Sequence, residues 1–169
     1  MGKHNQFEHL WTWRHFDPDG KLIYEFVDKK NILVDTGEKA IVDTFYRKNA
    51  ATYFAADQFY IGLYKGSIAE TTVLSTIPGE PSGNGYARTV VERSTVGFPT
   101  LEQDSGHWRV VSKDITFTAS GGNIGPVNGA FLGTSLLDTG VLICAVAAPI
   151  EQTILAGSDV IVSLKIKQL

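Results

Sequence analysis

Apolar residues take every second position in the segment 160–167, and polar residues take most of the positions between them. This period of two is the pattern of a β-strand with one buried face and one wet face. Similar runs near positions 61 and 116 extend the pattern, so we expect residues 59–169 to form one antiparallel sandwich. The side chains expected to face its core are Ile61, Leu63, Ile115, Phe117, Val160, Val162 and Leu164.

Two further β-rich runs, residues 10–16 and 21–27, precede this region and flank the tetrapeptide Asp17-Pro18-Asp19-Gly20. Proline at the second position and glycine at the fourth are typical of a type I turn. The Asp17 carboxylate is also placed to accept hydrogen bonds from its own backbone. The pattern therefore predicts a β-hairpin at the start of the chain.

Residues 35–48 carry the pattern of a helix. Asp35 and Glu38 have the spacing of a capping box, which favours a helix start at this point. A helix this short is not stable alone, so we expect its apolar face to pack against the sandwich. The i,i+4 pairs that define this face are Ile41/Phe45 and Val42/Tyr46.

Many short apolar runs separated by Gly, Pro, Asn and Asp fill the rest of the chain. This arrangement is typical of a sandwich or a jelly roll. We therefore predict a mainly β, antiparallel β-sandwich or jelly-roll-like domain with one short α-helix. Its parts are an N-terminal hairpin arm (1–34), the helix (35–50) and the sandwich (51–169). The loop 75–85, rich in proline and glycine, is expected to cross the surface.

Charge and cysteine content narrow the classes of partner. The 169 residues carry a net charge of −3 without a basic cluster, which argues against nucleic acid. No run of 18 apolar residues occurs, so we expect no membrane span. The single cysteine, Cys144, lies in an apolar run, and we interpret it as a buried core thiol rather than a nucleophile.

Motifs that carry catalytic chemistry are missing from the sequence. There is no HExxH, CxxC or Gly-x-Ser-x-Gly, and the glycine clusters are not followed by a phosphate-binding helix. Glu102 and Asp104 are close in sequence, but we assign them to a solvated turn rather than to a glycan-cleaving pair. We predict no enzyme activity, no metal site and no cofactor.

Aromatic residues crowd the predicted hairpin, and Trp11, Trp13, Arg14 and Tyr24 are the candidate partner-binding residues. A lone hairpin is marginal in water without a partner surface, and Trp, Tyr and Arg often dominate interface energy. The segment 1–34 is therefore the expected docking element. The alternative is that the hairpin folds back and completes the sandwich of its own chain.

The sequence also resembles a group of tailed-phage structural proteins, often encoded among head and tail genes. The phrase Glu-Pro-Ser-Gly-Asn-Gly-Tyr-Ala-Arg at 80–88 also resembles β-modules of phage tail fibres. The resemblance implies an antiparallel sandwich that decorates or completes a virion, and it implies no catalytic residue. The segments that carry it are Trp13, 19–21, Asn31, 37–38, 40–45, 59–64, 80–88, 129–132 and 157–162.

From this resemblance we expect a capsid decoration (cement) protein that binds the major capsid protein lattice. We expect it to be a homotrimer, made in the host cytoplasm and placed on the outer surface of the capsid. A tail or fibre component that contacts host receptors is the alternative, and loops of moderate length favour the capsid. Within the 80–88 phrase, Arg88 is expected to anchor the loop by bonding carbonyls or a carboxylate such as Glu80.

Overall fold

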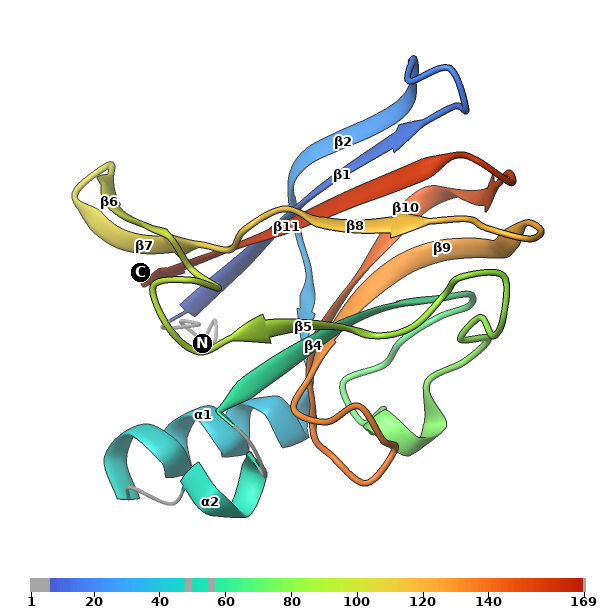
Figure 1. Cartoon of the computed structure of the whole chain (residues 1–169). Helices are drawn as coiled ribbons and strands as arrows, with labels where there is room; N and C mark the ends of the chain where they lie inside the picture. The colour runs from blue at the N-terminus through green and yellow to red at the C-terminus, as the bar shows by residue number, and fades with distance from the viewer. Residues whose placement is uncertain (1–6, 48–49, 55–56, 169) are drawn as a thin grey trace.

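The computed structural model describes residues 7–47, 50–54 and 57–168, which form two antiparallel sheets (Figure 1). The first sheet has the order β2 (Leu22–Lys30), β1 (Phe7–Phe16), β11 (Asp159–Gln168), β7 (His107–Val111) and β6 (Thr100–Asp104), with β8 (Ile115–Thr118) also beside β11. The second has the order β3 (Ile32–Leu33), β10 (Leu142–Ile154), β9 (Ile124–Gly133), β4 (Gln58–Tyr64) and β5 (Thr89–Glu92). The predicted mainly β class, an antiparallel sandwich, is confirmed.

The core lies between the sheets and contains the residues expected from the alternation. All seven predicted core side chains are buried, with no more than 3% of any of them exposed. Lys165 and Lys167 lie at the intervening positions of β11 and are only partly covered. The register predicted for the last strand is confirmed, because its apolar set faces inward and its lysines do not.

The strands β1 and β2 pair with each other, as predicted, but they do not form an arm outside the sandwich. Strand β1 lies in the interior of its sheet and pairs with β11 from Phe7↔Gln168 to Phe16↔Asp159. Its inward-facing side chains alternate along the strand and are buried. The hairpin therefore finds its partner surface in its own chain, and the alternative of a completed sandwich describes residues 7–33.

The turn between these strands has the predicted chemistry. The Asp17 carboxylate accepts hydrogen bonds from the backbone N–H groups of Asp19 (3.0 Å) and Lys21 (2.9 Å). Gly20 donates its N–H to the Asp17 carbonyl at 3.0 Å and has a φ of +78°. A left-handed φ is strained for residues with a side chain, which explains the glycine at this position.

The helix α1 (Asp35–Arg47) is confirmed, but the predicted packing of Phe45 against the sandwich is wrong. Phe45 is 72% exposed, and the helix instead buries a face that includes Gly37 and Ala40. A Cβ atom at Gly37 would collide with the backbone carbonyl of Ile143 in β10. Close contact between helix and strand therefore requires small residues, which turns the ring of Phe45 outward.

A second, single-turn helix, α2 (Ala50–Tyr53), follows α1, and a 3₁₀ turn, η1 (Leu74–Thr76), lies in the long connection after β4. Tyr53 donates its hydroxyl to the Asp43 carboxylate at 2.8 Å, which ties α2 to α1. Both helices lie at one end of the sandwich (Figure 1). The predicted last helical residue, 48, and residues 1–6 of the predicted arm lie outside the described residues.

Candidate interaction sites

The two predicted docking tryptophans are core residues. Trp11 and Trp13 are fully buried on the inner face of β1, and the Trp13 ring stacks on Phe26 with centroids 6.1 Å apart. This burial corrects their interpretation as partner-binding residues, because a side chain without exposed surface cannot form a contact with another molecule. The structure brings both into the centre of the core instead.

The other two predicted residues have more surface but are engaged within the chain. Arg14 lies on the outer face of β1 and forms an ion pair with Asp114 at 3.2 Å. Tyr24 is half-buried and packs edge-on against Phe26, with centroids 6.4 Å apart. The four predicted residues therefore share one hairpin, but they do not form an exposed patch.

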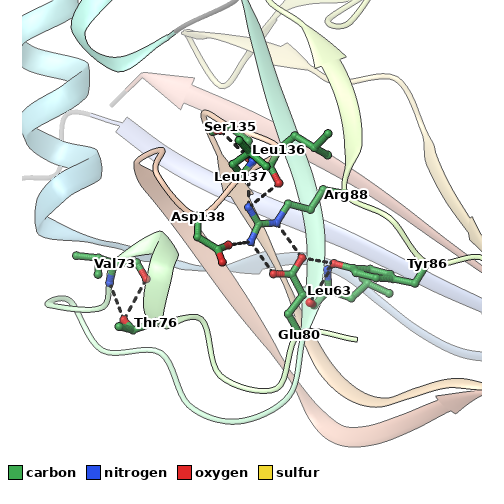
Figure 2. A network of polar contacts seen from close by, with 10 residues as sticks. All are labelled: Leu63, Val73, Thr76, Glu80, Tyr86, Arg88, Ser135, Leu136, Leu137 and Asp138. Carbon is green, nitrogen blue, oxygen red and sulfur yellow. Dashed lines mark hydrogen bonds and ion pairs between the residues drawn. The ribbon is translucent and has the colours of Figure 1, made fainter. Parts of the chain in front are cut away.

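A network of polar contacts surrounds one buried arginine, Arg88 (Figure 2). The Arg88 side chain is only 6% exposed, and its guanidinium holds both Glu80 oxygens, through Nε at 2.8 Å and Nη2 at 2.6 Å. Nη2 also contacts Asp138 at 2.6 Å. The Tyr86 hydroxyl donates to Glu80 at 2.8 Å and accepts the Leu63 backbone N–H at 2.9 Å. The predicted anchoring of the loop by Arg88 and Glu80 is confirmed.

The four side chains Glu80, Tyr86, Arg88 and Asp138 form what we call the Arg88 cluster. The hydrogen bond to Glu80 raises the pKa of Arg88, and burial together with the Glu80 charge raises the pKa of Tyr86. Arg88 therefore stays charged and Tyr86 stays protonated at neutral pH. These two side chains therefore keep one protonation state while they hold the loop.

The Arg88 cluster fixes the loop between β9 and β10 (Figure 2). Arg88 Nη1 donates to the carbonyls of Ser135 (3.3 Å) and Leu136 (3.1 Å). The side chains of Leu136 and Leu137 are 54% and 66% exposed at this fixed turn. We call residues 134–141 the dileucine loop. Its backbone is held by a buried charge, while its two apolar side chains face the solvent.

An apolar pocket of about 780 Å³ lies where α1 meets the two sheets. Aliphatic side chains from both sheets form much of its wall, and His9, Thr44, Arg93, Ser94 and Thr95 are the polar residues that line it. This composition, mostly apolar with few polar groups, is typical of small-molecule sites. Five aromatic rings also line it, those of Phe7, Phe45, Phe54, Phe59 and Phe98.

Two polar atoms of the pocket residues have no hydrogen-bond partner in the described structure, Nδ1 of His9 and Oγ1 of Thr44. Burial lowers the pKa of His9 from its ordinary value of 6.5 to about 4. The His9 ring is therefore neutral at physiological pH. Its neutrality leaves the pocket without a buried charge.

The depressed pKa of His9 predicts a loss of stability in acid. Below pH 6.5 the unfolded chain binds a proton at His9 that the folded chain does not bind until about pH 4. Unfolding is therefore favoured progressively between these pH values, by about 3 kcal/mol in total. We expect His9→Gln, which does not titrate, to lack this part of the pH dependence. The free energy of unfolding is measured with urea at several pH values between 6.5 and 4. An equally steep fall with decreasing pH in both proteins would contradict the assignment to His9.

Arg93 is the one ionised side chain among the described residues that line the pocket. Its guanidinium lies 4.0 Å from the ring centroid of Phe54 and 5.6 Å from that of Phe59. Nη1 of Arg93 pairs with Asp57 at 3.0 Å, and the Asp57 side chain is 79% exposed. The pocket thus combines an aromatic wall with a cation whose present partner is in solvent.

Further apolar surface is exposed on the β6–β7 hairpin, which extends beyond the body of the sandwich (Figure 1). Leu101 and Trp108 are exposed there. Glu102 and Asp104 lie on β6 and pair with Arg109 of β7, at 2.7 Å and 3.1 Å. They lie on a strand and not in a turn, which corrects that part of their assignment, while their side chains remain 44% and 35% exposed.

The described residues show no constellation for metal chemistry, since they contain no group of three His, Cys, Asp or Glu side chains able to hold an ion. Cys144 is buried, as predicted, and burial raises the pKa of its thiol. The described helices include none that is long and apolar enough to span a bilayer. The dileucine loop and the apolar pocket are the candidate sites that the described residues offer.

Sequence reasoning anticipated the Arg88–Glu80 bond but neither of these two sites. No protein-family model matches this chain, and a search of the curated proteins finds no match either.

Proposed function

We propose that this protein is a structural component of a tailed-phage virion, a decoration (cement) protein on the outer surface of the capsid. In this proposal it is made in the host cytoplasm and binds the major capsid protein lattice as a homotrimer. The proposal rests on the sequence resemblance and on one structural observation, the dileucine loop. Two adjacent leucines are exposed there on a backbone that a buried arginine holds in place.

The construction of this loop supports a role in docking. Its backbone is fixed by Arg88, by the Thr134–Val141 bonds at 3.0 Å and by the bond from the Leu137 N–H to Ser135 Oγ at 3.0 Å. A rigid loop loses little conformational entropy when it binds. Leu136 and Leu137 have no core to complete, so their burial against a partner would be a net gain. The phrase at 80–88 that resembles phage proteins supplies the clamp for this surface.

The proposal is tested with capsids that lack the decoration protein. We expect Leu136→Asp/Leu137→Asp to weaken co-sedimentation with such capsids by at least about tenfold, which corresponds to about 1.4 kcal/mol. Each substitution replaces a leucine that would be buried on binding with a charged carboxylate, so the tenfold effect is a conservative lower bound. The matched control is Ile150→Asp/Leu155→Asp, because those side chains are 54% and 50% exposed elsewhere on the surface.

The control variant is expected to bind like the wild type, and all three proteins should have similar thermal midpoints. Full capsid binding by the loop variant would refute docking through the dileucine loop. Failure of the wild-type protein to bind any such capsid would refute the decoration role itself.

A tail or fibre component that contacts host receptors is the second candidate, and the exposed side chain of Trp108 on the protruding β6–β7 hairpin favours it. Exposed aromatic rings provide stacking surfaces for sugars. Inhibition of phage adsorption to host cells by the purified protein, abolished in Trp108→Ala, would select this function over the capsid.

A further inference from the structure

The apolar pocket has no role in the proposed docking through the dileucine loop. Its volume of about 780 Å³ lies within the range of small-molecule sites, roughly 300–1,000 Å³. Among the residues that the structure describes, five phenylalanine rings line it, and contact between such apolar surface and water is unfavourable. His9 is among the lining residues and is almost fully buried, and its Nδ1 atom lacks a hydrogen-bond partner. These observations point to a ligand.

The charge of the wall indicates the polarity of that ligand. Arg93 is the single ionised residue among the described residues that line the pocket, and the phenyl ring of Phe54 supports its guanidinium at 4.0 Å. Among the described residues, the guanidinium of Arg93 forms one ion pair, which joins its Nη1 atom to Asp57. A planar guanidinium binds carboxylates through two parallel hydrogen bonds, so Arg93 retains donors for a second anion.

We propose that the apolar pocket binds an amphiphilic small molecule of the medium-chain carboxylate class, with its chain against the phenylalanine rings and its carboxylate at Arg93. Asp57 competes for the same guanidinium. Because the Asp57 side chain is 79% exposed, its displacement leaves the carboxylate in water and not in the protein interior. This inference goes beyond the proposed virion function and does not depend on it.

The ligand class is tested with three probes of equal chain length: decanoate, decanol and decyltrimethylammonium. We expect decanoate to bind in a saturable manner by isothermal titration calorimetry, below its micellar concentration, and about tenfold or more tighter than either of the others. Contacts between the decyl chain and the methyl groups of Ile143 and Ile166, which line the pocket, should appear in nuclear Overhauser spectra. No saturable binding, or equal affinity for the three probes, would overturn the proposal.

Two substitutions in the Arg93–Asp57 ion pair should have opposite effects on decanoate binding. Arg93→Gln removes the cation and should weaken decanoate binding about tenfold, while decanol affinity stays the same. Asp57→Asn removes the competing carboxylate and should tighten decanoate binding severalfold. The matched control is Arg14→Gln, which makes the same change of charge on the outer face of β1, where Arg14 pairs with Asp114.

The opposite effects of Arg93→Gln and Asp57→Asn on decanoate affinity separate a change in binding from a change in folding. A variant that merely loosened the protein would bind both decanoate and decanol more weakly. Weaker decanoate binding by Asp57→Asn, or an equal loss in Arg14→Gln, would overturn the role of Arg93. Capsid co-sedimentation depends on the dileucine loop and is measured separately, so failure here leaves the proposed function standing.

Discussion

Replacement of Trp13 by alanine is expected to lower the free energy of unfolding by about 3–5 kcal/mol. The indole is fully buried on β1, stacks on Phe26 and belongs to the main core cluster. Its removal leaves a cavity that the surrounding sheet cannot close. Urea unfolding followed by circular dichroism measures the change, and Trp108→Ala is the control because that ring is exposed.

The same experiment decides between a core role and a docking role for the first hairpin. The control should change stability by less than about 1 kcal/mol. If Trp13→Ala also lost less than about 1 kcal/mol, and instead failed to bind capsids, the hairpin would be the docking element that its aromatic content suggests. A large loss of stability agrees with the position of β1 between β2 and β11.

Replacement of Arg88 by leucine is expected to cost about 3–5 kcal/mol, because it removes one partner from a buried ion pair. Glu80, whose side chain is 20% exposed, would lose its guanidinium partner, and two carbonyls would lose a donor. Arg88→Lys should recover only part of this loss, since an ammonium cannot reproduce the bidentate geometry.

The control for this change is Arg109→Leu. Arg109 also bridges two carboxylates, but its partners Glu102 and Asp104 are 44% and 35% exposed, so the loss should stay near or below about 1 kcal/mol. A double variant, Glu80→Leu with Arg88→Leu, should be more stable than Arg88→Leu alone, because it no longer leaves the more buried of the two carboxylates, that of Glu80, without the guanidinium. Equal losses for Arg88→Leu and Arg109→Leu would show that the cluster contributes no more than a surface pair.

The parts of the fold that local sequence dictates could be predicted. Alternation located the inward face of β11, and the Asp17–Gly20 turn followed from proline, glycine and an aspartate that bonds its own backbone. The pairing of Arg88 with Glu80 was accessible because the two lie eight residues apart around a proline-stiffened loop.

The orientation of α1 could not be predicted from its apolar pairs. The apolar pairs favour the helix face that carries Phe45 as the buried one. The small size of Gly37 and Ala40 instead decides which face of the helix packs against β10. For β1, the sequence displays two tryptophans but not whether the strand lies at the edge or in the interior of its sheet, because its neighbour β11 is distant in sequence.

No local sequence pattern predicts the pocket either. Its wall is assembled from positions as distant as Phe7 and Ile166, and Arg93 follows an ordinary strand without a motif. Such a site exists only after both sheets and the helix are in place, so no period or spacing in the sequence encodes it.

The pairing of β1 with β11 has a consequence for folding during synthesis. Strand β1 is synthesised long before its partner β11, Asp159–Gln168. Among the described strands, β1 and β2 pair with no other member of their sheet until β11 is made, so the sheet that carries Trp11 and Trp13 stays incomplete. Contacts of such high sequence separation fold slowly and leave apolar surface open to aggregation. The nascent chain therefore depends on the speed of this pairing, and a chain stalled before residue 159 cannot complete the sheet to which its two buried tryptophans belong.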